Sequence, residues 1–370
     1  MSNDAVQAAA QDPEGLGARL RALCHAQGFA HVRFCSAEGA PGIDAYDAFL
    51  AAGHHGEMSW MARSRDARAD PRRVFAKAES AVVLAMNHLH LRPPDPGGLT
   101  GKVAAYAWGR DYHNLIGKRI KKIERWLREE GRPCFGGVDS RPFIERAWAE
   151  RAGLGYAARN CFTIRPGEGS GFFLAVILIS GPLPYDPPLK HGLARFCGSC
   201  TRCHRACPTD AFVGDGQLDA RRCISTLTIE NEGPIPEALR APMGRWVFGC
   251  DDCQDVCPHN HRPPSGAEED FAPVHAWLDL SWLLLADDDV LEAHFEGSPL
   301  RRPGALGLKR NAAVVLGNLG DQTARPALHA GLRHRSALVQ EHCAWALRAL
   351  DQRRDAELSP AARRLLSPCR

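Results

Sequence analysis

The cysteines in the middle of the chain have the type and spacing that hold iron–sulfur clusters. Cys197, Cys200, Cys203 and Cys207 follow the pattern C-x2-C-x2-C-x3-C, and a proline comes directly after the last of them. Bacterial ferredoxins use three cysteines of such a run for one 4Fe-4S cluster, while the fourth binds a second cluster. A second set of cysteine ligands is therefore expected further along the chain.

The second cysteine motif of the chain contains only three of the four ligands that a cluster needs. Cys250, Cys253 and Cys257 are again followed by a proline, but they are three cysteines where four are needed. Cys223 is the natural replacement, as if an insertion had separated it from the rest. By analogy with ferredoxins, we hypothesise that Cys257 is the fourth ligand of the first cluster and that Cys207 is the fourth ligand of the second. The eight cysteines together predict two 4Fe-4S clusters.

Zinc sites and disulfide bonds are the alternative uses of these cysteines. Pairs of cysteines two residues apart also bind zinc, but the ending C-x3-C-P, present twice, favours clusters. Disulfide bonds are less expected because the spacings are short and residues 1–13 lack the basic and apolar regions of a secretory signal. The other six of the 14 cysteines are expected as buried or spare thiols.

Length and composition indicate a chain of two or three domains. Its 370 residues exceed the roughly 250 to 300 at which single cores stop growing. The longest apolar run, at 172–179, is far below the ~18 residues that span a bilayer. We therefore expect a cytoplasmic protein that makes no use of a membrane.

The part of the chain before the cysteines reads as an α/β region that would position further functional residues. Residues 56–71 read as a loop. Apolar periodicity predicts helices at 16–27, 44–52, 114–128 and 143–153, and apolar runs predict strands at 30–34, 81–86, 103–108, 136–138 and 171–180.

Two residues of this region are candidates for chemistry. Asp139 lies between a short strand and a helix, where functional residues collect in α/β folds. Aspartate is also a preferred N-cap residue, and the sequence alone favours that role. His113, in Asp111-Tyr-His113, resembles the start of a cobalamin-ligating D-x-H-x-x-G signature, but Gly117 comes one place late. A structural histidine is therefore expected at 113.

The C-terminal part has a different character. Residues 311–319 and 342–350 superpose with small and apolar positions matched, which predicts a helical repeat of the HEAT type or a helical cap.

Basic residues crowd two segments and could contact phosphates, although a solvated helix face is the simpler interpretation. These segments contain Lys118, Arg119, Lys121, Lys122, Arg125, Arg128 and Arg132, and Arg301, Arg302, Lys309 and Arg310.

Several stretches taken together make the chain similar to the epoxyqueuosine reductase family, the cobalamin-dependent iron–sulfur enzymes of tRNA queuosine biosynthesis. In the first half these are residues 68–71 (RADP), 106–113 (YAWGRDYH), 138–142 (VDSRP) and 150–155 (ERAGLG). Beyond them come 197–208, 218–225 (LDARRCIS), 233–236 (GPIP), 249–254 (GCDDCQ) and 310–313 (RNAA). The matches span nearly the whole chain.

The resemblance implies a fold of three parts. Residues 1–188 would form an α/β (α+β) cobalamin-binding domain, residues 189–265 a ferredoxin-like module with two 4Fe-4S clusters, and residues 266–370 an all-α, HEAT-like domain. Arg159 stands where many members of the family have a lysine, so the cation is kept. A monomer is expected, supplied by an external electron donor such as a flavodoxin or a ferredoxin.

The resemblance also implies a site and a mechanism. Electrons from the two clusters would generate cob(I)alamin, which attacks the epoxide of epoxyqueuosine at the tRNA wobble position, and loss of water would give queuosine in the last step of its biosynthesis. Asp139 would be the proton donor, with its neutral form favoured by burial against the corrin. The base-off cobalamin would lie near Arg68, Asp139, Thr163, Leu174, Ser225, Cys250, Asp251 and Asp252.

Two other functions compete with this interpretation. A reductive dehalogenase-like enzyme would share cobalamin and two clusters, but such enzymes usually carry a twin-arginine export signal, which residues 1–13 do not contain. An iron–sulfur electron carrier without catalysis would leave the large α/β region unexplained, and adding cobalamin should not change its spectrum.

Overall fold

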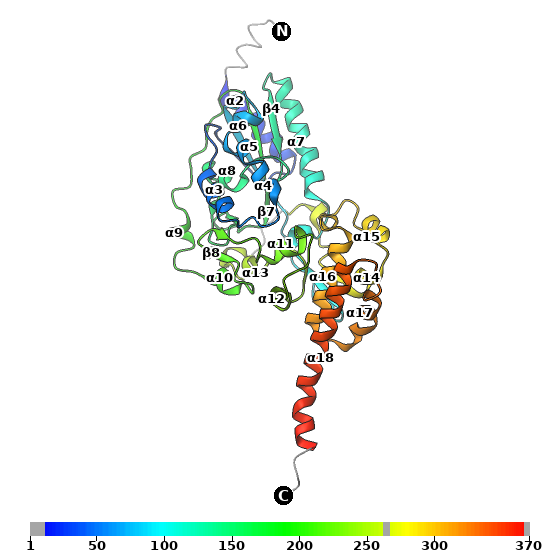
Figure 1. Cartoon of the computed structure of the whole chain (residues 1–370). Coiled ribbons are helices and arrows are strands. Elements are labelled where there is room, and N and C mark those ends of the chain that lie inside the picture. Colours follow the sequence, from blue (N-terminus) through cyan, green and yellow to red (C-terminus); the bar gives the residue numbers. More distant parts are fainter. Residues whose placement is uncertain (1–11, 262–266, 366–370) are drawn as a thin grey trace. The chain divides into compact units, whose positions relative to one another are not determined.

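The computed structural model describes residues 12–261 and 267–365 of the chain (Figure 1). Contacts group the chain into two compact units, each assembled from separate segments. The first unit consists of residues 1–91, 109–221 and 251–273, and the second of residues 92–108, 222–250 and 274–370. The division into three domains that was predicted from the sequence stays a prediction.

A four-stranded antiparallel sheet forms the centre of the first unit. Its strand order is β1 (His31–Ser36), β2 (Ser80–Asn87), β7 (Phe172–Ile179) and β4 (Cys134–Gly137). Val83 of β2 pairs with Val176 of β7, and every residue of β2 is buried. A strand that is covered on both faces reads as a continuous apolar run, which is the pattern that predicted it.

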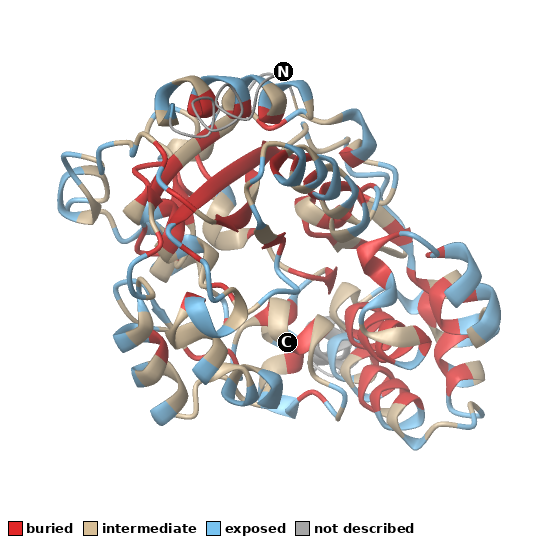
Figure 2. Ribbon diagram, turned by 90° about the horizontal axis from the view of Figure 1, so that it is seen from above, coloured by how far each residue is buried: buried red, intermediate tan, exposed pale blue. Residues whose placement is uncertain are grey.

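Helices cover this sheet on its two faces. On one face α8 (Glu145–Arg151) packs Trp148 and Ala149 against alternate residues of β2 and β7. The next residues along β2 point to the opposite face because side chains alternate along a strand, and α7 (Tyr112–Glu129) and α2 (Pro13–Ala26) contact the sheet there. The buried residues of these strands, which include all of β2, appear red in Figure 2.

Two predictions for the first 110 residues are wrong. The expected loop at 56–71 folds into α4 (Ser59–Arg63), α5 (Arg65–Ala69) and α6 (Pro71–Val74), which follow α3 (Ile43–Ala51). Helices of four or five residues are too short to show apolar periodicity. The expected strand at 103–108 ends with β3 (Thr100–Val103), and a 3-10 turn at Ala105–Ala107 follows it.

The second unit combines a small sheet with helices. Strand β3 pairs in parallel with β10 (Trp246–Phe248) and antiparallel with β11 (Trp277–Asp279). The predicted helical character of the C-terminal part is confirmed. Its helices are α14 (Leu280–Leu285), α15 (Asp288–His294), α16 (Gly304–Leu319), α17 (Arg325–Gly331) and α18 (Ala337–Leu365), and the second unit also contains α11 (Ile224–Ile229) and α12 (Glu237–Arg240). None of the helices in the described ranges combines the length and the apolar character needed to cross a bilayer.

Helix α16 is the core of the second unit and is buried almost throughout. The side chain of Arg310 is fully buried and donates to the carbonyls of Leu227, Asn231 and Gly233 at 2.9, 2.5 and 2.7 Å. The Asn311 amide donates to the carbonyls of Thr228 and Val247 at 2.8 and 3.0 Å. These two polar residues therefore fix the chain around α11 and β10.

Candidate functional site

Four of the eight predicted cluster ligands lie together in the first unit. Cys197 follows α9 (Leu193–Phe196), Cys200 lies in the next turn, and Cys203 is part of α10 (Arg202–Ala206). Cys257 follows α13 (Asp252–Asp255) and packs in a small apolar cluster with Cys197. Burial raises the pKa of Cys257, and the nearby charges of Cys197 and Cys200 raise it further. These thiols influence one another's charge, and their assignment to a common 4Fe-4S cluster stays a prediction.

The other four predicted ligands are distributed over both units. Cys207 follows α10 and Cys253 lies in α13, both in the first unit. The Cys207 sulfur accepts a hydrogen bond from the backbone of Ala211 at 3.3 Å. Cys223 stands just before α11 and Cys250 just after β10, both in the second unit.

The hairpin of β5 (Tyr156–Ala157) and β6 (Thr163–Ile164) supports the cysteine loops of the first unit. Arg159 forms an ion pair with Asp215 at 2.6 Å, in the loop between β8 (Phe212–Gly214) and β9 (Gln217–Leu218). Its guanidinium also donates to the carbonyls of Gly198 and Cys200. The cation at position 159 therefore orders the loop that carries the first three cysteines.

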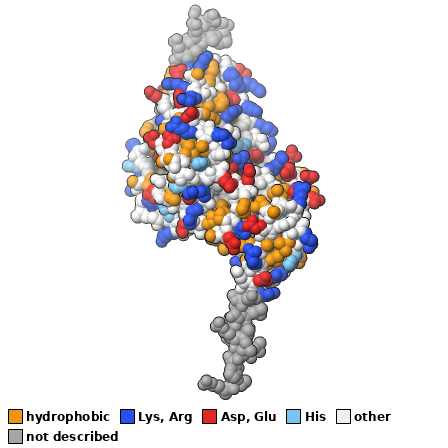
Figure 3. All heavy atoms as spheres, in the orientation of Figure 1, with side chains coloured by type: hydrophobic (Ala, Val, Ile, Leu, Met, Phe, Trp, Pro, Cys, Tyr) orange, Lys and Arg blue, Asp and Glu red, His pale blue; other side chains and the backbone are white. Residues whose placement is uncertain are grey.

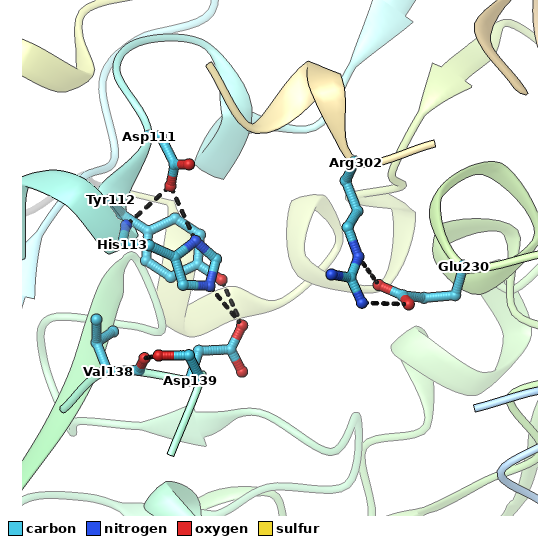
Figure 4. A network of polar contacts seen from close by, with 8 residues as sticks. Asp111, Tyr112, His113, Val138, Asp139, Glu230 and Arg302 are labelled. Carbon is cyan, nitrogen blue, oxygen red and sulfur yellow. Dashed lines mark hydrogen bonds and ion pairs between the residues drawn. The ribbon is translucent and has the colours of Figure 1, made fainter. Parts of the chain in front are cut away.

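A second cluster of polar side chains surrounds Asp139, in the loop between β4 and α8 (Figure 4). The Tyr112 hydroxyl donates to Asp139 Oδ2 at 2.6 Å, and Nε2 of His113 lies 3.2 Å from the same oxygen. Nδ1 of His113 lies 2.9 Å from Asp111 Oδ1. Both ring nitrogens of His113 therefore face carboxylates, which is the arrangement of an imidazolium donor.

Aromatic stacking fixes the position of these groups. The Tyr112 ring stacks on the ring of His113 with centroids 4.0 Å apart, and on the ring of Phe173 at 4.2 Å. Phe173 in turn lies on strand β7. Helix α7 begins at Tyr112, and Asp111 caps it by accepting from the His113 backbone. The start of α7 and the central sheet thus hold the two donors against Asp139.

The interpretation of Asp139 as an N-cap is wrong. Helix α8 begins six residues later, with Ile144 in the cap position. Asp139 instead has a backbone φ of +50°, in the left-handed region that residues other than glycine rarely adopt. Its side chain is 60% exposed. Such local strain is typical of functional loops.

Among the described residues, electrostatics favour the charged form of Asp139. The neutral form expected on burial against the corrin stays a prediction. Neighbouring protein atoms partly desolvate the carboxyl group and favour its neutral form. The hydrogen bonds from His113 and Tyr112, and the charges of His113 and Arg68, outweigh this effect and leave the pKa of Asp139 below its ordinary value. Asp139 is therefore ionised at neutral pH.

The proton is instead on His113. Burial opposes its charged form, but the hydrogen bonds and charges of Asp111 and Asp139 prevail and raise the pKa of His113 from 6.5 to about 9. A titration of the histidine rings by NMR should therefore show one midpoint near pH 9, absent from His113→Gln. Because the folded pKa lies above the ordinary value, the stabilisation by this ion pair should be complete below pH 6.5 and disappear as the pH rises through 9. A His113 midpoint near 6.5 would contradict this assignment.

Glu145, the first residue of α8, is a further acid beside Asp139. Its Oε1 is shielded from solvent and has no hydrogen-bond partner among the described residues. Burial raises the pKa of Glu145 to about 8, and the charge of Asp139 adds to the rise. Glu145 therefore carries a proton at neutral pH. Arg68 of α5 acts on both acids, stabilising their charged forms.

The other residues predicted near a corrinoid lie in both units. Arg68, Thr163, Leu174, Asp251 and Asp252 belong to the first unit, and Ser225 and Cys250 to the second. Arg68 Nε donates to Ser64 Oγ at 3.0 Å, and its guanidinium lies 5.8 Å from the Trp60 ring centroid. Leu174 is partly buried on the core of the sheet, and Asp251 is buried at the start of α13.

Thr163 provides the test of whether these residues suit a polar cofactor. It is 4% exposed, and its hydroxyl oxygen has no hydrogen-bond partner among the residues that the structure describes. A buried hydroxyl normally has such a partner. The residues present therefore fit a group that brings its own polar atoms to β6.

Sequence reasoning missed Tyr112, His113 and Glu145 as members of the site. His113 was expected as a structural histidine, and no individual role was predicted for Tyr112 or Glu145. Asp111, Tyr112 and His113 lie more than 25 positions before Asp139, and the contact depends on the antiparallel sheet. The one available signal was the pair Asp111 and His113, two residues apart at the start of a helix.

Two family models match the chain. The model described as "Epoxyqueuosine reductase QueG, DUF1730" matches residues 68–144, and the model described as "4Fe-4S double cluster binding domain" matches residues 196–260. The first region contains Arg68, Tyr112, His113 and Asp139. The second contains all eight predicted cluster cysteines.

Known proteins resemble the chain over most of its length. The epoxyqueuosine reductase of Xanthomonas campestris pv. campestris is 40% identical over 351 residues, which cover 91% of this chain and 96% of that protein. The epoxyqueuosine reductase of Escherichia coli K12 is 40% identical over 322 residues, covering 84% and 83%. A crystal structure of an epoxyqueuosine reductase with a tRNA-Tyr epoxyqueuosine-modified stem loop matches with a TM-score of 0.84 and 28% identity, covering 93% of this chain and 92% of that one.

Proposed function

Since this chain belongs to the epoxyqueuosine reductase family, we propose that it reduces epoxyqueuosine to queuosine at the wobble position of tRNA, as the last step of queuosine biosynthesis. The 40% identity to a reductase along 91% of the chain carries this proposal. The solved relative that binds a modified tRNA stem loop supports the choice of substrate. The enzyme would act as a monomer that receives electrons from an external carrier protein.

The proposal includes three cofactors. The double cluster binding domain would hold one 4Fe-4S cluster on Cys197, Cys200, Cys203 and Cys257, and another on Cys207, Cys223, Cys250 and Cys253. A base-off cobalamin, when bound and reduced, would supply the nucleophilic two-electron chemistry. Thr163 and Arg68 would hold it through the unpaired hydroxyl and the guanidinium, together with Leu174, Ser225, Cys250, Asp251 and Asp252.

The residues around Asp139 would supply a proton to the reaction. Opening an epoxide and losing its oxygen as water consumes two protons and two electrons. Asp139 would present one proton to the opening oxygen after receiving it from His113, since the two share a hydrogen bond at Oδ2. The pKa of about 9 at His113 keeps that proton available at neutral pH. Tyr112 would orient the carboxylate through its 2.6 Å hydrogen bond.

The assignment of cysteines to clusters can be tested by counting iron. We expect Cys257→Ala and Cys200→Ala each to lose about half of the iron, and the double variant to lose no more, because both cysteines serve one cluster. Cys200→Ala combined with Cys207→Ala should lose nearly all of it. Cys343→Ala, which changes a buried thiol of the second unit, is the control and should keep its iron. Loss of nearly all iron from the Cys200 and Cys257 double variant would exclude a shared cluster.

The tRNA backbone would meet the exposed face of α7. Five basic side chains on this face are exposed: Lys118, Lys121, Lys122, Arg125 and Arg128. They extend over about 15 Å of helix, and Figure 3 shows basic side chains gathered over the place where α7 lies in Figure 1. Arg119 and Arg132 turn inward to backbone carbonyls. The second basic segment is unsuitable because Lys309 and Arg310 are buried.

Salt dependence tests this contact. For Lys121→Gln with Lys122→Gln we expect weaker tRNA binding at low salt, and a slope of log affinity against log salt that is smaller by roughly 1.5. Fluorescence anisotropy with a labelled anticodon stem loop would measure both. Lys77→Gln with Lys190→Gln removes two exposed charges elsewhere and should change neither. An unchanged slope in the α7 variant would remove α7 from the tRNA surface.

The reaction itself is tested with reconstituted protein. The clusters are rebuilt without oxygen, cobalamin and a reductant are added, and queuosine formation on tRNA that carries epoxyqueuosine is followed by mass spectrometry. Product that requires both clusters and cobalamin supports the proposal. Corrinoid binding without product would reject the substrate, and the absence of corrinoid binding would reject the cofactor.

A further inference from the structure

A hollow of about 470 Å³ lies on the first unit beside the cysteine helices. It is lined by Arg202, Arg205, Ala206, Val256 and His261. Helices α10 and α13, which supply these residues or end next to them, pack against each other and are neighbours in Figure 1. Alanine and valine form its apolar part, and the two arginines and the histidine add polar, nitrogen-bearing side chains.

Three residues that line the hollow are direct neighbours, along the chain, of predicted cluster ligands. Arg202 precedes Cys203, Ala206 precedes Cys207, and Val256 precedes Cys257. Two of these cysteines belong to the first proposed cluster and Cys207 to the second. An electron that arrives at this surface therefore has cluster ligands of both sets one residue away along the chain.

The two arginines of the hollow differ from several other arginines of the first unit in having no ion pair among the described side chains. Arg65, Arg159 and Arg221 each form an ion pair with an aspartate. Arg202 and Arg205 are exposed, and over residues 12–261 and 267–354 neither has an ion pair. The acidic residues of α13, Asp252 and Asp255, have interactions of their own. Two arginines at an apolar surface suit a protein partner with acidic groups around an apolar centre.

We propose that this hollow is the docking surface for an acidic one-electron carrier protein. The inference rests on the proposed function, because it assumes that the cysteines hold clusters. Each encounter moves one electron from the carrier to the cluster beside the hollow, and two encounters supply the two electrons of epoxide reduction. Small, charge-steered contacts are characteristic of redox partners, which must separate quickly.

The test compares two reductants on the protein with both clusters and without cobalamin or tRNA. Arg202→Glu with Arg205→Glu reverses both charges and changes no cluster ligand. At low salt, stopped-flow bleaching of the cluster absorbance by a reduced flavodoxin, an acidic carrier, should slow by about tenfold or more. Bleaching by photoreduced deazaflavin, a small reductant without a docking requirement, should keep its rate. Lys77→Glu with Lys190→Glu, which reverses two exposed charges elsewhere, is the control of equal charge and should behave like the original protein.

Every outcome decides the proposal. Docking at the hollow is supported if the arginine variant is reduced more slowly by flavodoxin but not by deazaflavin. The rate at which flavodoxin reduces the original protein should also fall as the salt concentration rises. An unchanged flavodoxin rate overturns it, and so does equal slowing with both reductants, since the arginines would then serve the cluster itself. Failure here is independent of epoxyqueuosine reduction, because neither the tRNA nor the corrinoid takes part in the measurement.

Discussion

Asp139→Asn should lower the rate of queuosine formation by about 100- to 10,000-fold, the range typical of a lost general acid. Asparagine has nearly the same shape as aspartate and can still accept from Tyr112, but it cannot relay a proton from His113. Single-turnover kinetics with pre-reduced cobalamin would isolate the chemical step. Binding of the tRNA stem loop should remain within about twofold, because a side chain at the reacting centre adds little to phosphate contacts.

A second measurement on the same variant separates proton transfer from a change in structure. Removing the Asp139 charge takes away part of what raises the pKa of His113, so the His113 midpoint should move down from about 9. Asp66→Asn changes an exposed carboxylate of α5 and should alter neither the rate nor that midpoint. Full activity of Asp139→Asn in single turnover would refute its role in protonation.

Arg310→Met should destabilise the second unit by about 3 to 5 kcal/mol. The guanidinium is fully buried and serves the carbonyls of Leu227, Asn231 and Gly233, which methionine would leave without donors. An unpaired buried carbonyl costs roughly 1 to 3 kcal/mol. Denaturant unfolding followed by circular dichroism, with the variant and the original protein compared in their first transition, would measure the loss.

Arg301→Met is the matched control for this prediction. Arg301 lies in the same basic segment of the sequence but is exposed, and its replacement should change stability by no more than about 0.5 kcal/mol. Equal stability of the two variants would mean that the buried network contributes little. Arg310→Lys should fall between them, because an ammonium group cannot reach all three carbonyls from one position.

Local patterns in the sequence were sufficient for most of the framework. The apolar run of β2 and the periodicity of α7 predicted their elements within two residues, because each is long and buried in the way that its pattern requires. The cysteine spacing and the family motifs led to the double cluster domain. The helices from Ser59 to Val74 escaped prediction because each has only four or five residues.

The candidate site was less accessible to sequence reasoning because it depends on contacts between distant residues. Asp139 was recognised through its motif, but its ionisation depends on Tyr112 and His113, which α7 brings to it. Burial against the corrin was expected to favour the neutral acid, whereas the histidine beside it favours the charged form. Glu145, which does hold its proton, gives no sign of it in the sequence.

The buried polar residues of α16 also constrain the order in which the protein can mature. Asn311 holds Thr228 and Val247, and the Thr228 hydroxyl accepts from Gly249, so α11 and β10 are tied to one helix. These elements carry Cys223 and Cys250 at their ends. During synthesis both cysteines leave the ribosome well before residue 311, and domains fold as units once their parts are present. Insertion of the second cluster is therefore expected to follow synthesis of the helical region, and premature termination before α16 should yield a chain that binds one cluster.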